Sequence, residues 1–246
     1  FRRVLFRSAV FTRPSSTPSA AWTARCWKGG WTAVKGNVDY RLYLVTDRDL
    51  MTAATLEQAV EQAILGGCTV VQLREKAASS RDFYEEACRL RALTRRYGVP
   101  LIINDRLDMA LAVDADGLHV GQGDLPAAVC RRLLGPDKLL GVSVATVAEA
   151  EQARRDGADY LGIGAMFAQQ TKPDARPVSW QTYRAIRAAV RLPAVVIGGM
   201  DATTGRAFVQ DGIEGLAVVS AILAQPDIRA AAQAIRAVLD AAPDGR

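Results

Sequence analysis

The sequence predicts an α/β protein: a (β/α)8 TIM barrel in a single domain, preceded by an irregular N-terminal extension. From Tyr40 onward, short apolar runs alternate with amphipathic segments of helical period, and this happens eight times in about 200 residues. Glycine-centred breaks precede several of the apolar runs, as expected where a helix ends before a strand. A doubly wound open sheet is the alternative. An open sheet of this kind would be expected to have a G-x-G-x-x-G turn after the first strand, and this chain has TDRDLM there instead.

The predicted strands are runs of five to seven residues rich in Val, Ile and Leu, which suit a parallel sheet buried on both faces. They cover residues 41–47, 69–75, 101–105, 117–121, 139–144, 160–165, 194–199 and 215–220. The predicted helices lie after them, where apolar residues recur every three or four positions. They cover residues 56–65, 81–97, 106–113, 125–134, 147–156, 179–190, 203–211 and 227–241.

The net charge of +5 is unevenly distributed along the 246 residues. Residues 1–38 hold seven basic residues and no acidic one, which leaves 24 basic and 26 acidic residues in the rest of the chain. The body of the protein is therefore slightly acidic, and no nucleic-acid partner is expected. No apolar run is long enough to span a bilayer, so no membrane partner is expected either.

Residues 1–38 form an irregular basic extension, and residues 39–246 form the expected catalytic domain. The extension contains three of the four tryptophans and the stretch RPSSTPSA. It has three interpretations: a disordered tail, an organellar presequence, or upstream codons wrongly joined to the gene. The last is favoured because the chain begins with Phe1.

The four cysteines, at positions 26, 68, 88 and 130, are widely spaced and include no C-x-x-C pair. This spacing suggests neither a zinc site nor a disulfide framework. A reducing, cytoplasmic location is the expectation.

Polar residues gather at the carboxyl ends of the predicted strands, where the active sites of such barrels lie. Gln72, Arg74 and Lys76 occupy alternate positions, so an amide, a guanidinium and an ammonium share one face. The ends of later strands add Asn104, Asp105, Asp124, Ser143, Thr171, Lys172, Gly198, Gly199, Val219 and Ser220.

Three cations and two carboxylates are thus predicted around one rim. Arg74, Lys76 and Lys172 suit a polyphosphate, and Asp105 and Asp124 suit a Mg²⁺ ion that bridges to it. On the opposite side, the glycines after the seventh strand and the backbone N–H groups after the eighth suit a second phosphate. Two anion sites imply two phosphorylated substrates, or one long one.

Each of these features also has a structural interpretation. Arg74 and Glu75 are compatible with an ion pair at the rim, residues 104–105 with a helix N-cap, and residues 198–199 with a tight turn. His119, the only histidine, is expected to be a packed, hydrogen-bonded core residue without a catalytic step. Ser143 lacks a G-x-S-x-G elbow, so binding or orienting is expected of it, not nucleophilic attack.

Seven stretches resemble the thiamine-phosphate synthase family in their order and approximate spacing. They are YLVTD, QLREK, LIINDRLDMALAVDADGLHVGQGDLP, GVSV, YLGIGAMFAQQTKPDA, VVIGGM and VVSAI, within a region of similarity from about Tyr40 to Leu239. The combination of Q-x-R-x-K, N-D and G-Q-x-D is highly specific, whereas a lone G-G or V-S is not. The resemblance implies a TIM barrel that joins the two halves of thiamine.

The resemblance also implies a role for each matching residue. Hydroxymethylpyrimidine diphosphate would be held by Gln72, Arg74, Lys76, Asn104, Ser143 and Lys172, of which Arg74, Lys76, Ser143 and Lys172 are the expected catalytic residues. Asp105 and Asp124 would bind Mg²⁺. The phosphate of hydroxyethylthiazole phosphate would be held by Gln169, Thr171, Gly199, Val219 and Ser220.

In this family the thiazole nitrogen displaces pyrophosphate from the methylene carbon of the pyrimidine, through a transition state with carbocation character. A fixed cluster of cations suits this reaction, because the departing pyrophosphate gains negative charge. No protein nucleophile is required. The family also suggests a homodimer.

The loop after the sixth strand departs from the family pattern G-P-[IV]-[FY]-P-T-x-T-K. It reads GAMFAQQTK, with Ala165 and Ala168 where prolines are usual and Gln169 in place of the first threonine. Fewer prolines should loosen the loop, and the lost hydroxyl should weaken the thiazole-phosphate site. The alternatives are a thiazole tautomerase-like isomerase and a non-catalytic homologue that binds phosphate ligands.

Overall fold

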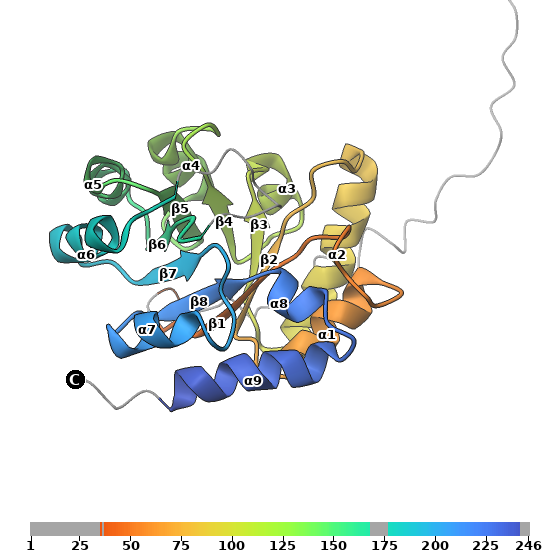
Figure 1. The fold of residues 1–246 in the computed structure, drawn as a ribbon. Coiled ribbons are helices and arrows are strands. Elements are labelled where there is room, and N and C mark those ends of the chain that lie inside the picture. Colours follow the sequence, from red (N-terminus) through yellow and green to blue (C-terminus); the bar gives the residue numbers. More distant parts are fainter. Residues whose placement is uncertain (1–34, 36, 168–176, 242–246) are drawn as a thin grey trace, which may run out of the picture. The chain divides into compact units, whose positions relative to one another are not determined.

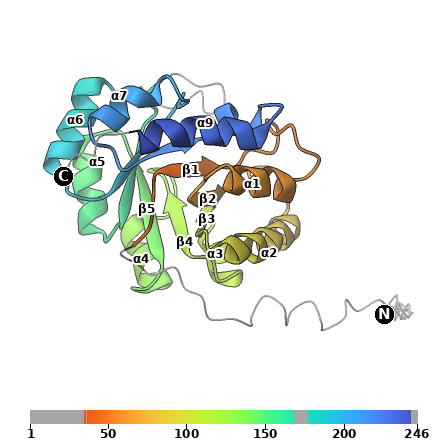
Figure 2. The same ribbon diagram turned by 90° about the horizontal axis from the view of Figure 1, so that it is seen from below.

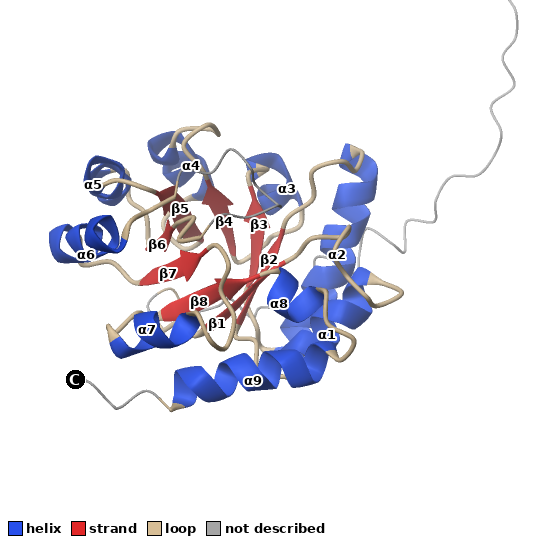
Figure 3. Ribbon diagram, viewed as in Figure 1, coloured by secondary structure: helices blue, strands red, loops and turns tan. Residues whose placement is uncertain are grey.

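The computed structural model describes residue 35 and residues 37–167 and 177–241. In this part of the chain, parallel strands follow one another in sequence order around a closed barrel, and the first strand pairs with the last. Helices surround the ring of strands (Figures 1 and 3). The predicted TIM barrel is confirmed.

The strands are short, and most of them contain four residues. They are β1 (Leu42–Val45), β2 (Val70–Leu73), β3 (Leu101–Asn104), β4 (Gly117–Val120), β5 (Leu139–Val144), β6 (Tyr160–Ile163), β7 (Ala194–Ile197) and β8 (Gly215–Val218). Each coincides with a predicted strand, although most of the predicted strands continue into the loop that follows. These loops carry the polar residues predicted at the strand ends.

The helices match the predicted segments, with one addition. They are α1 (Leu56–Leu65), α2 (Ser80–Tyr97), α3 (Leu107–Ala112), α4 (Ala127–Leu134), α5 (Val147–Arg155), α6 (Trp180–Ala189), α7 (Gly205–Gln210), α8 (Ser220–Leu223) and α9 (Ile228–Asp240). The short helix α8 was not predicted. The eighth strand was predicted to reach residue 220, which is wrong, because the chain leaves the strand after Val218 and turns into α8.

Side-chain caps explain where several of the helices begin. A side-chain oxygen accepts a hydrogen bond from a backbone N–H of the first turn at Thr55, Ser79, Thr146, Ser179 and Asp227. Helix α2 ends at Gly98, which has the positive φ of 66° that favours glycine. Helix α9 lies across β1 and beside α1 (Figure 2), so the end of the barrel covers its beginning. No helix in the described ranges combines the length and apolarity of a membrane span.

The inside of the barrel is apolar at the end where the strands begin. Tyr43, Val70, Ile102, Leu139, Tyr160, Val195 and Ala217 pack there in one cluster. Closer to the carboxyl ends of the strands, the inward positions become polar, with Gln72, Asn104, His119 and Ser143. The barrel therefore has a packed apolar floor beneath a polar mouth.

A repeated ion pair stabilises the opposite face, where the strands begin. In each repeat, an arginine of an even-numbered helix binds an acidic residue that lies just before an even-numbered strand. This carboxylate also accepts the backbone N–H of the first or second residue of the preceding strand. The three sets are Arg91, Asp116 and Leu101; Arg131, Asp159 and Leu140; and Arg187, Glu214 and Ala194. Each set connects one helix to two neighbouring strands.

Loss of the most buried of these pairs should destabilise the barrel. Both side chains of the Arg91–Asp116 pair are almost inaccessible, at 4% and 2% exposure. Asp116→Asn leaves the guanidinium buried without a countercharge, so the free energy of unfolding should fall by about 3–5 kcal/mol in urea denaturation.

The control for this substitution is Asp108→Asn. Asp108 forms an ion pair with Arg106, but its side chain is 60% exposed. This substitution should change the free energy of unfolding by less than about 1 kcal/mol. Equal effects of the two substitutions would contradict a special role for the buried pair.

Candidate active site

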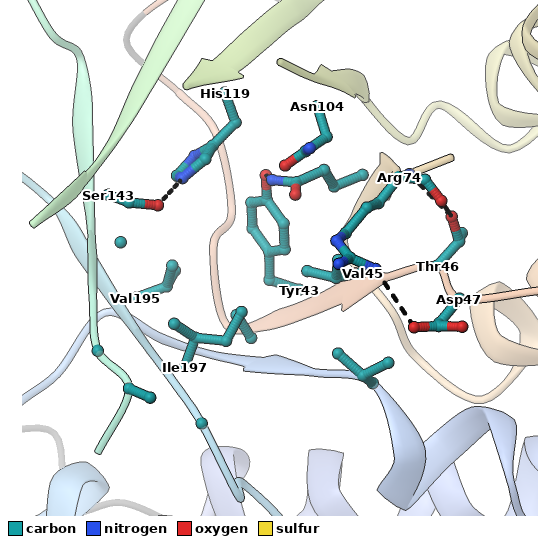
Figure 4. Close-up of a pocket in the computed structure, with 17 residues that line it drawn as sticks. Tyr43, Val45, Thr46, Asp47, Arg74, Asn104, His119, Ser143, Val195 and Ile197 are labelled. Atoms are coloured by element: carbon teal, nitrogen blue, oxygen red, sulfur yellow. Dashed lines mark hydrogen bonds and ion pairs between the residues drawn. The ribbon is translucent and has the colours of Figure 1, made fainter. Parts of the chain in front are cut away.

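A cavity opens at the carboxyl ends of the strands, and residues from all eight strands or the loops that follow them line it. Figure 4 shows side chains converging on it from several strands, among them Arg74, Asn104, His119 and Ser143. Five residues of the predicted site line the cavity: Gln72, Arg74, Asn104, Ser143 and Val219. The structure therefore has a cavity at the position predicted for the active site.

Gln72 and Arg74 face this cavity from β2 and the loop after it. The Gln72 side-chain nitrogen Nε2 donates to the hydroxyl oxygen of Tyr43 at 2.8 Å. The Arg74 guanidinium forms an ion pair with Asp47 at 3.3 Å, and the backbone N–H of Arg74 donates to Thr46 Oγ1 at 3.0 Å. The two contacts of Arg74, drawn in Figure 4, hold this residue at the wall of the cavity.

The alternative interpretation, an ion pair between Arg74 and Glu75 at the rim, is wrong. Glu75 binds Arg48 at 3.1 Å, while Arg74 binds Asp47. Successive side chains of an extended segment point in opposite directions, so neighbours in sequence take different partners. Arg74 is thus directed to the cavity, and Glu75 to the outside.

Lys76 lies further out than the residues of β2. It lines an outer hollow of the rim together with Arg74, and its side chain is 59% exposed. Its ammonium forms an ion pair with Asp105 at 2.7 Å. Exposure to solvent therefore increases along the three alternate residues, from Gln72 on the buried strand through Arg74 to Lys76 at the open rim.

Asp105 has an unusual backbone conformation for a residue other than glycine. Its φ is +62°, and a hydrogen bond of 2.7 Å from Arg106 N to Asn104 O closes a tight turn around it. Its own N–H donates to His119 O at 2.8 Å. The interpretation of residues 104–105 as a helix N-cap is wrong, because α3 begins at Leu107 with Arg106 as its N-cap. Such strain is typical of residues whose side chain must take a particular direction.

Asp124 completes a carboxylate pair with Asp105. One of its carboxylate oxygens accepts the backbone N–H of Gly121 at 2.7 Å. Burial and the neighbouring Asp105 carboxylate raise the pKa of Asp124. Burial also favours a higher pKa at Asp105, but the hydrogen bonds with Lys76 and Asp124 and the charge of Lys76 together outweigh it and lower the pKa of Asp105. The two carboxyl groups therefore interact: Asp105 keeps its charge, and Asp124 takes up a proton more readily than an ordinary aspartate.

This carboxylate pair fits a Mg²⁺ ion. Mg²⁺ prefers hard oxygen ligands and is commonly held by one or two carboxylates, with water and phosphate oxygens at its other positions. Within the described ranges, no group of three or more His, Cys, Asp or Glu residues is placed to hold a metal. The pair therefore fits an ion that arrives with a phosphate better than a permanent metal centre built from side chains.

Ser143 and His119 lie side by side on neighbouring strands. The Ser143 hydroxyl oxygen is 2.8 Å from His119 Nε2 (Figure 4). His119 is only 7% exposed, so the prediction of a packed, hydrogen-bonded histidine is confirmed. It also lines the cavity, which the sequence did not indicate.

The opposite wall is built on backbone. Gly198 and Gly199 have φ values of +108° and +67°, so the tight turn expected there is present. A Cβ atom at Gly198 would lie 2.7 Å from the backbone nitrogen of Met166, so only glycine lets this turn approach the loop after β6. Gly199 directly follows Gly198, and Ser220 directly follows Val219, which lines the cavity.

The remaining predicted residues, Gln169, Thr171 and Lys172, lie outside the described residues. Sequence analysis also missed some residues of the wall, notably Tyr43, Thr46 and Asp47. Asp47 directly follows the first predicted strand, so the rule used for the other strand ends applied to it as well. Tyr43 and Val45 alternate on β1, and this spacing was the signal that Tyr43 faces inward.

Known proteins were compared with this chain at the levels of sequence and structure. Residues 42–222 match the model of the thiamine monophosphate synthase family. The thiamine-phosphate synthase of Ruminiclostridium cellulolyticum is 56% identical over 200 residues, which cover 81% of this chain and 95% of that relative. The thiamine-phosphate synthase of Clostridium beijerinckii is 55% identical over 203 residues, which cover 82% of this chain and 97% of the relative.

Solved structures agree with the sequence comparison. A thiamine phosphate pyrophosphorylase from Pyrococcus furiosus superposes with a TM-score of 0.76 at 38% identity, over 82% of this chain and 96% of that one. A 3-hexulose-6-phosphate synthase superposes with a TM-score of 0.59 at 20% identity, over 81% of this chain and 99% of that one, a likeness of fold alone. With the matched family model and relatives above half identity over nearly their whole length, the chain belongs to the thiamine monophosphate synthase family.

Proposed function

We infer that this protein is a thiamine-phosphate synthase, a transferase that condenses hydroxymethylpyrimidine diphosphate with hydroxyethylthiazole phosphate and releases pyrophosphate. The observation that carries this inference is a series of contacts at the rim: Arg74 and Lys76 line one hollow, Lys76 forms an ion pair with Asp105, and Asp105 neighbours Asp124. A diphosphate needs cations on one side and a metal bridge on the other, and this rim offers groups for both.

Departure of the pyrophosphate is the step that these residues would assist. As the bond to the methylene carbon breaks, negative charge accumulates on the leaving group. Arg74, held by Asp47, and Lys76, held by Asp105, are fixed before the substrate arrives, so little reorganisation accompanies the reaction. The cavity would then hold the thiazole nitrogen against the carbon that has become electron-poor.

We propose that Asp105 and Asp124 hold Mg²⁺ together with the diphosphate. When bound, the ion would supply positive charge to the pyrophosphate oxygens. Two observations support this assignment: a cation between the carboxylates would relieve the repulsion that helps to raise the pKa of Asp124, and Asp105 already accepts a hydrogen bond from the Lys76 ammonium.

The two substrates would occupy different walls of the cavity. Gln72, Asn104 and Ser143, which line it from β2, β3 and β5, would hold the pyrimidine diphosphate together with Lys172. Gly199, Val219 and Ser220 would hold the thiazole phosphate, with Gln169 and Thr171. The glycine turn after β7 supports this arrangement, because backbone without side chains allows a phosphate to approach closely.

The proposed function is tested by incubating the purified protein with both substrates and Mg²⁺ and measuring thiamine phosphate and pyrophosphate. Both products are expected in equal amounts. Isomerisation of a thiazole without pyrophosphate release would indicate a tautomerase instead, and binding without product would indicate a non-catalytic homologue. In the same assay, Lys76→Met should lower kcat/KM by about 100-fold.

A matched control for Lys76→Met is Lys138→Met. Lys138 also forms an ion pair with an aspartate, Asp114, but these two residues lie in the loops just before strands, away from the mouth. Its kcat/KM should stay within about twofold of the unchanged protein. Equal losses in both variants would contradict a role of Lys76 at the diphosphate.

The carboxylate pair predicts how the protein depends on metal. Asp124→Asn should raise the Mg²⁺ concentration for half-maximal activity by at least about tenfold, because one charged ligand is lost. Calorimetric titration of Mg²⁺ in the presence of pyrophosphate should show the same loss of affinity. Since the pKa of Asp124 is raised, protonation should weaken Mg²⁺ binding at a higher pH than for an ordinary aspartate. Asp108→Asn is the control, and an unchanged Mg²⁺ requirement in Asp124→Asn would refute the assignment.

The altered sixth loop predicts a weakened thiazole site. Gln169→Thr restores the hydroxyl that is usual in the family at this position, so the KM for the thiazole phosphate should fall by about three- to tenfold, the effect of one hydrogen bond to a phosphate. The KM for the pyrimidine diphosphate should not change. An unchanged KM for the thiazole phosphate would show that the hydroxyl is not needed there.

We also propose that the protein is a homodimer in the cytoplasm and that residues 1–38 form an irregular basic extension of the catalytic domain. Sedimentation of the purified protein tests the first point. Fractionation of the cells tests the second. The mass of the native N-terminus tests whether the extension exists in the mature protein. In the described part of the chain, Cys68 and Cys130 form no disulfide, which supports a reducing location.

A further inference from the structure

A continuous chain of hydrogen-bonded side chains crosses the inside of the barrel beneath the cavity. Gln72 Nε2 lies 2.8 Å from the Tyr43 hydroxyl, which lies 2.7 Å from the Tyr160 hydroxyl. The Tyr160 hydroxyl lies 3.1 Å from His119 Nδ1, and His119 Nε2 lies 2.8 Å from Ser143 Oγ. The chain therefore joins Gln72 to Ser143, two residues that line the proposed pyrimidine site from opposite sides.

Two glycines make room for the central part of this chain. A Cβ atom at Gly141 would lie 2.2 Å from the Tyr160 ring and 2.4 Å from His119 Nδ1. A Cβ atom at Gly162 would lie 3.0 Å from the His119 ring. Any side chain at Gly141 would thus break the contact between the phenol and the imidazole. The packing of β5 and β6 therefore accommodates this series of hydrogen bonds, which is more than a chance approach of polar atoms.

The direction of the chain follows from the number of protons in it. The Gln72 amide nitrogen can only donate, so the Tyr43 oxygen accepts from it. Tyr43 is fully buried, and its single proton needs an acceptor, which the Tyr160 oxygen provides. Burial raises the pKa of both phenols, so both keep their protons.

The same count fixes the tautomer of His119. Tyr160 accepts from Tyr43 and directs its own proton to His119 Nδ1. Nδ1 must then be the unprotonated nitrogen of a neutral imidazole, and Nε2 carries the proton. Nε2–H donates to the Ser143 oxygen, which leaves the proton of the Ser143 hydroxyl to point elsewhere.

We propose that Tyr160 is a positioning residue that, through His119, holds the Ser143 hydroxyl as a hydrogen-bond donor into the cavity. The acceptor would be an atom of the pyrimidine diphosphate, so this role rests on the proposed function. In the reverse direction Ser143 would donate its proton to His119, so it could only accept a hydrogen bond from the cavity, and the Tyr43 proton would be buried without a partner. Tyr160 does not line the cavity itself and acts only through the histidine.

The first test needs no substitution, because His119 is the only histidine in the protein sequence. Tag-free protein labelled with ¹⁵N-histidine gives one pair of ring nitrogen signals in a long-range ¹H–¹⁵N correlation spectrum. The expected result at neutral pH, without substrates, is a protonated Nε2 and an unprotonated Nδ1. A protonated Nδ1, in the other tautomer or in the imidazolium, would overturn the proposal.

The second test removes the central hydroxyl with Tyr160→Phe. Nδ1 then loses its donor, so the ¹⁵N signals should shift to values averaged between the two tautomers. The kcat/KM for the pyrimidine diphosphate should fall about tenfold, the effect of one misdirected hydrogen bond, while the KM for the thiazole phosphate should change less than twofold. Unchanged ¹⁵N signals, or an unchanged kcat/KM, would overturn the positioning role.

The matched control is Tyr183→Phe. Tyr183 is also fully buried, but it lies on α6, where it packs against Trp180 and Phe208 outside the barrel. The Tyr183→Phe substitution should leave the histidine signals and the kcat/KM unchanged. An effect equal to that of Tyr160→Phe would overturn the proposal. If the protein makes no thiamine phosphate but shows the expected tautomer, the proposed function fails while the direction of the hydrogen-bond chain stands.

Discussion

Closure of the barrel by the pairing of β1 with β8 is the constraint on which the rest of the molecule depends. Without this pairing, both edge strands would expose unpaired backbone groups. With it, all the strands point the same way around one ring, and their carboxyl ends meet at one mouth. Residues that lie far apart in the sequence, such as Asp47 and Val219, come to share a single cavity for this reason.

The two ends of the barrel use charge in different ways. Where the strands begin, buried or partly buried arginines bind carboxylates that also accept backbone N–H groups, so the charges are paired within the protein. At the mouth, Lys76 and Asp105 form an exposed ion pair, and burial and the neighbouring Asp105 carboxylate raise the pKa of Asp124. Charges that are satisfied internally stabilise the fold, whereas those at the mouth remain available to a ligand.

Much of this architecture could be predicted from sequence, because each strand and each long helix has its own periodicity. Gln72 was found because alternation along a strand places it on one face with Arg74, and Asn104 was found because it lies at the carboxyl end of the third strand. Helix α8 was missed because four residues are too few to show a period. The contact of Tyr43 with Tyr160 was missed because it depends on the register across the barrel, which local sequence does not contain.

The arginine sets have a consequence for how the chain could be divided. Each set joins an even-numbered helix to the two strands that follow it. The unit that one set holds together is therefore helix, strand, helix, strand. This unit begins with a helix, whereas the repeat along the sequence begins with a strand. A circular permutant opened between β4 and α4 would leave all three modules whole, whereas one opened between α4 and β5 would cut through one of them. The junctions of ancestral duplications and of laboratory recombinants are therefore expected after even-numbered strands.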